Sequence, residues 1–262
     1  MRNKRLLLIF GIFVVVVLAA VIGSAVFSLQ NIEVVFKDEF DEFVSIDLNA
    51  YGGLDLDNTK RDFNGKSILV LDRKELAKTV ESDNLWLSVL STETSFHNSL
   101  KITAIVRTPV FHFKAGEVFY TCDYQGFVMT AEKLPNTIEV VSSELSSLQV
   151  QVGAYLNCDA VRITCQVIEA LWRQGDEVRK FSDIPHYMET IVFTQEQPLR
   201  LKTVYGAEFI INEPSKEMLE KFTAVHGLFL TLPDRQHDGV FRTGYTKSAD
   251  GQGWQASVES GE

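Results

Sequence analysis

The sequence predicts a single transmembrane helix followed by an α+β fold in two parts. Three observations support this: an uncharged run at Leu6–Ile32, prolines that all lie from Pro109 onward, and hydrophobic patterns that change near residue 108. The first part is expected to have the order strand, helix, helix, strand, strand (β-α-α-β-β), and the second to be β-rich with two helices. The expected boundaries are a cytoplasmic stub at 1–5, the transmembrane helix at 6–29, a small domain at 30–108, a β domain at 109–246 and a disordered tail at 247–262.

The uncharged run is long enough to cross a bilayer core of about 30 Å at 1.5 Å per residue. Arg2, Lys4 and Arg5 precede it, so the positive-inside rule places the N-terminus in the cytoplasm. The sequence therefore predicts a single-pass protein of the inner membrane, with most of the chain outside the cytoplasm. A cleaved signal peptide is the alternative, because Gly23-Ser24-Ala25 could form its cleavage site.

Charge and cysteine content narrow the classes of ligand. The formal net charge is −10, which argues against nucleic acid as a partner. The three cysteines are an odd number, so they form no full disulfide framework. Cys158 and Cys165 lie two turns apart on one expected helix, where they are interpreted as small buried hydrophobes. With no Cys or His beside them at ligand spacing, neither a metal nor a cofactor is predicted.

The first part begins with an alternating apolar pattern that predicts a strand. Asp72 and Glu75 form a capping box, in which each side chain satisfies a backbone N–H at the start of a helix. Leu76 and Val80 are the expected buried residues of that helix, while residues 37–53 show no assignable pattern. The expected elements are strand 31–36, helices 57–63 and 73–82, and strands 85–91 and 99–107.

The second part begins with a hairpin and continues with strands around two helices. The longer helix follows Asn157, a suitable cap, and stops at Gly175. The expected elements are strands 110–113, 118–121 and 127–129, helix 159–174, strands 190–194, 199–205 and 208–212, helix 215–225, and a last strand at 239–245.

A search for catalytic chemistry finds no signature of an enzyme class. The five histidines are scattered without a pair at i,i+4, and the acidic residues form no distinctive pair. The sequence therefore favours a non-catalytic protein with no small-molecule substrate. An anchored enzyme, with a site assembled from scattered carboxylates, is kept as an alternative.

Four short motifs occur in an order that is typical of one family. They are Gly65-Lys66-Ser67-Ile68-Leu69-Val70-Leu71-Asp72, Leu100-Lys101-Ile102, Arg107-Thr108-Pro109-Val110 and the turn Asp123-Tyr124-Gln125-Gly126. In this the chain resembles the bacterial cell-division proteins FtsQ and DivIB. It departs from their pattern at His97 and Val106, where the family has proline and glutamate.

The resemblance implies a POTRA-like domain at 30–108, a following β domain, and a scaffold at the division septum. The implied partners are division proteins of the FtsL and FtsB or DivIC type. In the family the last strands offer an edge for a partner strand, and here Gly239–Tyr245 matches them. Phe241, Arg242 and Tyr245 are the expected partner contacts, with Trp254 a further exposed candidate. The alternative is a POTRA-bearing component of secretion or envelope assembly.

Overall fold

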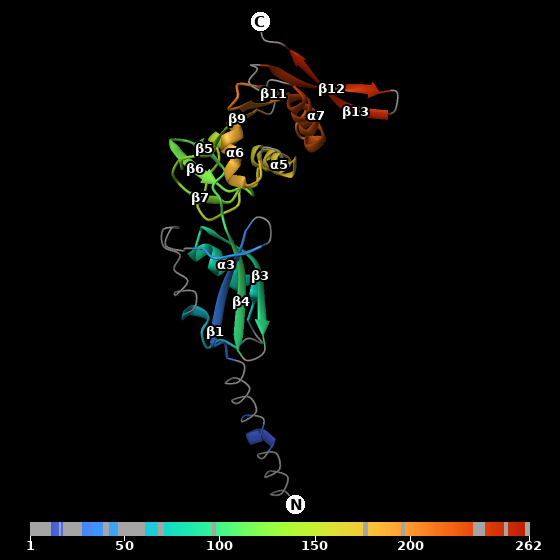
Figure 1. Ribbon diagram of the computed structural model, residues 1–262. Coiled ribbons are helices and arrows are strands. Elements are labelled where there is room, and N and C mark those ends of the chain that lie inside the picture. Colours follow the sequence, from blue (N-terminus) through green and yellow to red (C-terminus); the bar gives the residue numbers. More distant parts are fainter. Residues whose placement is uncertain are drawn as a thin grey trace, which may run out of the picture. The chain divides into compact units, whose positions relative to one another are not determined.

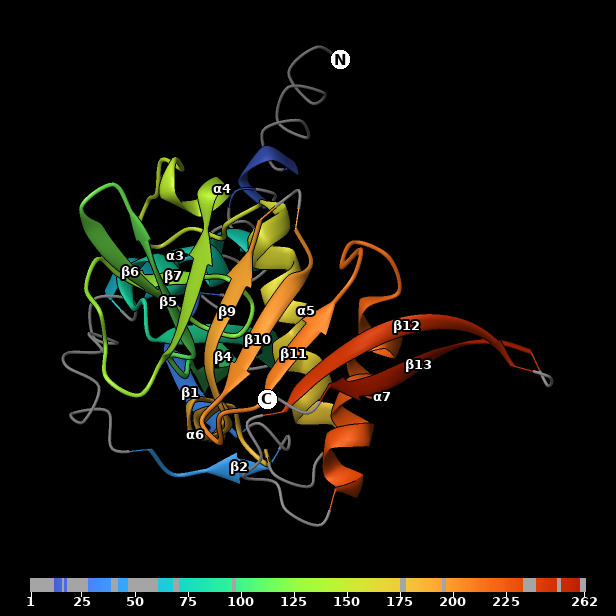
Figure 2. The same ribbon diagram turned by 90° about the horizontal axis from the view of Figure 1, so that it is seen from above.

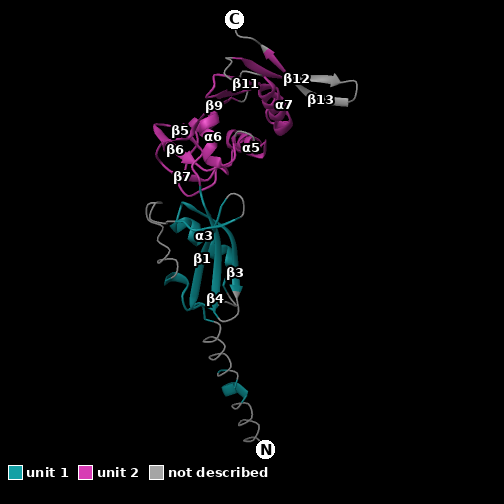
Figure 3. Cartoon of the chain, viewed as in Figure 1, with its two compact units in different colours: residues 1–107 teal, residues 108–262 magenta. Residues whose placement is uncertain are grey.

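The structure is a computed structural model that describes residues 12–15, 17, 28–38, 42–46, 61–67, 71–95, 98–174, 178–194, 197–232, 239–248 and 251–259. The chain divides into two compact units, residues 1–107 and 108–262 (Figure 3). The sequence predicts this junction at Arg107-Thr108-Pro109.

The predicted transmembrane helix is corrected by the structure. Over the described ranges, no helix is long and apolar enough to cross a membrane. Most of the predicted span at 6–29 lies outside those ranges, and its end belongs to unit 1. Leu29 is fully buried, its N–H donates to the carbonyl of Lys66 at 2.7 Å, and Ser28 forms a β-bridge with Ser67. Because no described helix could cross a membrane, the placement as a single-pass inner-membrane protein is withdrawn.

Unit 1 contains a four-stranded sheet in the order β2-β1-β4-β3 and the helix α3 (Figure 1). Strands β1 and β4 are parallel, and the other two pairs are antiparallel. Leu76 and Val80 of α3 pack into the same core as Leu100 and Ile102 of β4. The elements are β1 (Asn31–Lys37), β2 (Phe43–Val44), α3 (Arg73–Asp83), β3 (Leu87–Ser95) and β4 (Ser99–Val106).

The predictions for unit 1 are confirmed in part. Asp72 caps α3, because its Oδ1 accepts from the N–H groups of Lys74 at 2.9 Å and Glu75 at 3.3 Å. Of the helix predicted at 57–63, only 61–63 is described, and it is helical. The strand β2 was not predicted, since it lies in the stretch without an assignable pattern.

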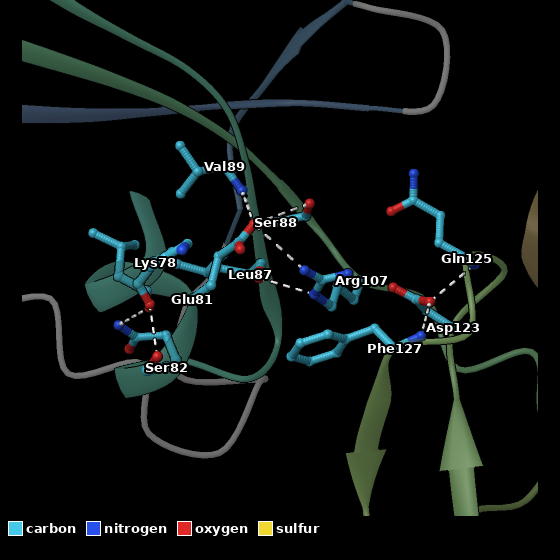
Figure 4. Close-up of polar contacts among 12 residues, drawn as sticks. Lys78, Glu81, Ser82, Leu87, Ser88, Val89, Arg107, Asp123, Gln125 and Phe127 are labelled. Carbon is cyan, nitrogen blue, oxygen red and sulfur yellow. Dashed lines mark hydrogen bonds and ion pairs between the residues drawn. The ribbon is translucent and has the colours of Figure 1, made fainter. Parts of the chain in front are cut away.

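A buried arginine joins the end of unit 1 to its helix (Figure 4). Arg107 donates through Nε to the carbonyl of Leu87 at 3.0 Å and through Nη2 to Oε1 of Glu81 at 3.4 Å. The same carboxylate oxygen accepts from the N–H of Val89 at 2.8 Å. Because Glu81 lies on α3 and Val89 on β3, these hydrogen bonds join the helix to strand β3.

Unit 2 is built on a nine-stranded sheet in the order β13-β12-β11-β10-β9-β8-β5-β6-β7. Three of its pairs are parallel: β5 with β8, β8 with β9, and β11 with β12. The strands are β5 (Phe111–Ala115), β6 (Val118–Cys122), β7 (Val128–Thr130), β8 (Ile138–Ser142), β9 (Met188–Phe193), β10 (Leu199–Thr203), β11 (Glu208–Ile211), β12 (Val240–Ser248) and β13 (Gly251–Glu259). The helices are α4 (Ser143–Ser146), α5 (Asp159–Gln174), α6 (Ile184–Tyr187) and α7 (Met218–Thr231), with a 3-10 turn at Phe181–Asp183.

One face of this sheet carries the two long helices, α5 and α7 (Figure 2). Side chains of β8 and β10 alternate strictly between buried and exposed, as expected for strands with one covered face. The helix predicted at 159–174 is confirmed to the residue. However, its N-terminus is capped by Glu144 rather than by Asn157, since the Glu144 carboxylate accepts from the N–H of Ala160 at 2.9 Å.

Unit 2 differs from the prediction in three further respects. The tail expected to be disordered contains β13, which pairs with β12 from Val240↔Glu259 to Ser248↔Gly251. The short parallel strand β8 was missed. The unit also has the short helices α4 and α6 beside the two that were predicted.

A tight turn joins β6 to β7 and contacts α5. Oδ1 of the buried Asp123 accepts from the N–H groups of Gln125 and Phe127, both at 2.9 Å (Figure 4). Gly126 has φ +81°, and a Cβ there would lie 2.5 Å from Cγ1 of Val161. The glycine of this motif is therefore required by both backbone conformation and close packing.

We expect Gly126→Ala to lower the free energy of unfolding by about 3 kcal/mol, from left-handed strain plus overpacking against Val161. Gly116→Ala is the matched control, because Gly116 has φ +58° and a Cβ there would meet nothing within 4 Å. It should lose only about 1 kcal/mol from strain. Denaturant titration of both variants measures the difference, and equal losses would contradict the role of the Val161 contact.

Candidate functional site

The two edges of the nine-stranded sheet differ in whether another segment of the chain pairs with them. At the β7 edge, Val128 exchanges backbone hydrogen bonds with residues 153–154, at 2.8 and 2.9 Å, and Phe127 forms a β-bridge with Tyr155. At the other edge, β13 pairs with β12 on one side and with no strand of the described part of the chain on the other. An uncovered strand edge presents N–H and C=O groups that another strand can pair with.

The last two strands form a ribbon that leaves the body of the sheet (Figure 2). Their pairing extends over nine register positions, whereas β12 pairs with β11 over only three, Glu208–Ile210 with Val240–Arg242. We call Val240–Glu259 the C-terminal ribbon. After Arg242, no described strand pairs with β12 on the side where β11 lies.

Phe241 anchors the base of the ribbon. Its side chain is fully buried, with ring centroids 5.6 Å from Phe209 of β11 and 5.4 Å from Phe229 of α7. Both contacts are nearly perpendicular, a favoured geometry for aromatic pairs. The structure therefore places this predicted contact residue in the core.

The other predicted contacts lie along the ribbon. Arg242 is exposed, in register with Ile210 on one side and Ser257 on the other. The backbones of Tyr245 and Trp254 are register partners, so the structure brings together two residues predicted separately. Their side chains lie outside the described residues. On β13, Ser257 and Val258 are exposed.

A polar cluster holds the ribbon where it leaves β11. Asn212 donates through its N–H to Oγ1 of Thr243 and through Nδ2 to the Thr243 carbonyl, each at 3.1 Å. The fully buried Lys221 of α7 donates through Nζ to the carbonyls of Asn212 at 2.9 Å and Glu213 at 2.8 Å. Burial lowers the pKa of Lys221, and the carboxylates of Glu213 and Glu217 partly offset this.

Sequence reasoning missed Lys221, although a signal was present. A lysine stands among the apolar positions Met218, Phe222 and Val225, at the helical spacing that marks a buried stripe. A charged residue at such a position needs strong hydrogen-bond partners. Here they are the carbonyls of the loop before α7, where Glu213 has the positive φ of 47°.

A hollow of about 660 Å³ lies beside the ribbon's base. Its lining combines the buried Ile163 and Phe193 with polar and charged residues that include Asp159, Asn212 and Lys216. Asn212 belongs both to this hollow and to the cluster that holds Thr243.

The structure offers little that resembles a reactive centre. Within the described ranges, no group of three or more His, Cys, Asp or Glu residues could hold a metal ion. Burial raises the pKa of the Cys165 thiol to about 12 and raises that of Cys122 as well, so both stay protonated near neutral pH. Comparison with protein-family models and with curated proteins found no match.

We expect Lys221→Met to lower the free energy of unfolding by about 2–4 kcal/mol, because two carbonyls lose the charged donor that they share. Lys216→Met is the control, since its side chain is 74% exposed and pairs with Glu213 on the surface. Denaturant titration gives both values. A loss no larger than that of the control would show that the ribbon's base does not depend on this lysine.

Proposed function

We propose that this protein is a non-catalytic scaffold of the bacterial cell-division machinery, which recruits protein partners by strand addition to the C-terminal ribbon. The observation that carries the docking part is the difference between the two sheet edges. One is covered by residues 153–155, and the other ends on β13, which has no further described strand beside it although α7 lies against it. The resemblance of the ordered motifs to FtsQ and DivIB supports the division role.

The proposed docking strand is β13 rather than Gly239–Tyr245. Because β13 occupies the outer side of β12, a partner strand would add to Gly251–Glu259. Nine residues at about 3.3 Å each give an edge of about 30 Å. Main-chain bonds would supply affinity, and side chains such as the exposed Val258 would supply selectivity.

The proposed partners are division proteins of the FtsL and FtsB or DivIC type. A segment that adds a strand must become ordered on binding, so its affinity depends on how many of its groups find partners. The exposed Arg242 lies across the ribbon from Ser257, where it can contact such a segment on the sheet face.

Removal of residues 249–262 tests the docking strand. The truncated chain lacks β13 but keeps β12, so we expect it to lose co-purification of the coiled-coil partners while unit 1 stays folded. Capture that survives this truncation but is lost on removal of 239–262 would contradict docking on β13 and restore β12 as the docking strand.

A point variant makes the same test without removing a strand. Val258→Lys places a charge on the proposed edge, where the valine is 41% exposed. Val141→Lys is the matched control on β8 of the same sheet, with a valine that is 45% exposed. We expect only Val258→Lys to weaken capture, and equal effects of the two variants would contradict the assignment.

Depletion tests the cellular role separately. Cells depleted of the protein should grow long without forming septa, and the full-length chain should restore division. Cells that divide normally after depletion would contradict the division role. If depletion gives long cells and residues 1–248 restore division, the role stands and docking on β13 fails.

A further inference from the structure

At the far end of the sheet from the ribbon, a histidine is buried beneath the connection between β7 and β8. His112 lies on β5, where its side chain is 2% exposed. Residues 131–137 pass over it, and we call them the 131–137 loop. His112 is in register with Thr121 on β6 and with Glu139 on β8.

The hydrogen bonds identify the tautomer of His112. Oγ1 of Thr137 donates its single proton to the carbonyl of Leu134 at 2.7 Å. The same oxygen lies 2.9 Å from Nδ1 of His112, so Nδ1 carries a hydrogen and donates to it. The other ring nitrogen, Nε2, is then a bare acceptor in the neutral ring. It is buried, with no hydrogen-bond partner among the described residues.

Thr121 holds the same loop from the neighbouring strand. Its Oγ1 donates to the carbonyl of Glu132 at 2.6 Å and accepts from the N–H of Leu134 at 3.1 Å. Two cross-strand neighbours, His112 and Thr121, therefore fasten the loop to the sheet. Of the two, only the histidine changes charge near neutral pH.

The groups around His112 disfavour its charged form. Burial lowers the pKa of His112 from 6.5 and the cation of Lys133 lowers it further, while Glu139 and a backbone hydrogen bond with Thr137 partly offset both. The ring of Phe119 lies 6.1 Å from that of His112, with Nζ of Lys114 and of Lys133 within 6 Å of its centroid. A proton on Nε2 would therefore be buried without an acceptor among the described residues and close to the cation of Lys133.

We propose that the 131–137 loop is a pH-sensitive clasp, fastened to the sheet while His112 is neutral and released when Nε2 takes up a proton. Above about pH 6.5 the ring is neutral whether the loop is fastened or released, so pH has no effect. Below that value the released form binds the proton more readily. The fastened form loses stability as the pH falls from about 6.5 to the lowered pKa, and below it the loss stays constant.

Hydrogen exchange of the full chain tests the clasp. Between pH 7.5 and 5.5, and after correction for intrinsic exchange, opening of the 131–137 loop should rise at least about threefold. A reference segment in β10, Leu199–Thr203, should not change in this way. His112→Asn keeps a donor near the position of Nδ1 but cannot titrate in this range, so its loop should show no such rise.

An acid-dependent rise in His112→Asn, or a loop in the native chain that ignores pH, would overturn the proposal. If the His112→Asn loop is open at both pH values, an NMR titration of the His112 ring in the native chain decides. A ring midpoint that coincides with the midpoint of loop opening supports the clasp, and separate midpoints overturn it.

Discussion

The burial of Phe241 is the interaction on which the C-terminal half of unit 2 depends. Its ring meets Phe209 of β11 and Phe229 of α7, and Phe222 packs against Phe209 in the same cluster. Burial of one phenylalanine contributes about 1.5–3 kcal/mol, and each aromatic pair adds about 0.5–1.5 kcal/mol. Since only three register pairs join β12 to β11, this contact sets where the ribbon begins and which face it turns to the helix.

Hydrogen bonds of Lys221 and Asn212 also hold the base of the ribbon, beside the aromatic cluster. Lys221 brings a cation into the interior, where it is tolerated because two carbonyls accept hydrogen bonds from its ammonium group. Asn212 of the loop that supplies those carbonyls also donates hydrogen bonds to the hydroxyl and to the carbonyl of Thr243. The base of the ribbon is thus held by packing and by hydrogen bonds together, while its outer part pairs only with itself. A two-stranded ribbon alone is marginally stable, so partner binding there gains by completing a third strand.

Local patterns predicted much of the fold, and failures occur where the deciding contact is distant in sequence. The helix Asp159–Gln174 has a full apolar stripe and a glycine after it, so both ends could be predicted. The uncharged run suggested a membrane helix, and its hydropathy could not show that Leu29 at its end packs into the core of unit 1. The Gly- and Ser-rich tail suggested disorder, yet β13 finds its backbone partners on β12.

For the candidate site, the turn residues before 239 predicted the strand at 239–245, and the resemblance suggested a docking edge there. Neither could show that β13 covers that edge, or that Phe241 faces the core while Arg242 faces outward. Lys221 and His112 were missed because single polar residues in apolar surroundings reveal their partners only in three dimensions.

The unequal pairing of β12 also has a mechanical consequence. Its neighbour β13 is joined to it along nine register positions, but β11 along only three. A pull on an attached partner would therefore load the short junction first, in the same place where Asn212 grips Thr243. The ribbon would peel from the sheet as one piece before its own strands separated, and α7 would lose its Phe241 contact at that moment. Tension on the partner would thus reach the interior of unit 2 through a single hinge.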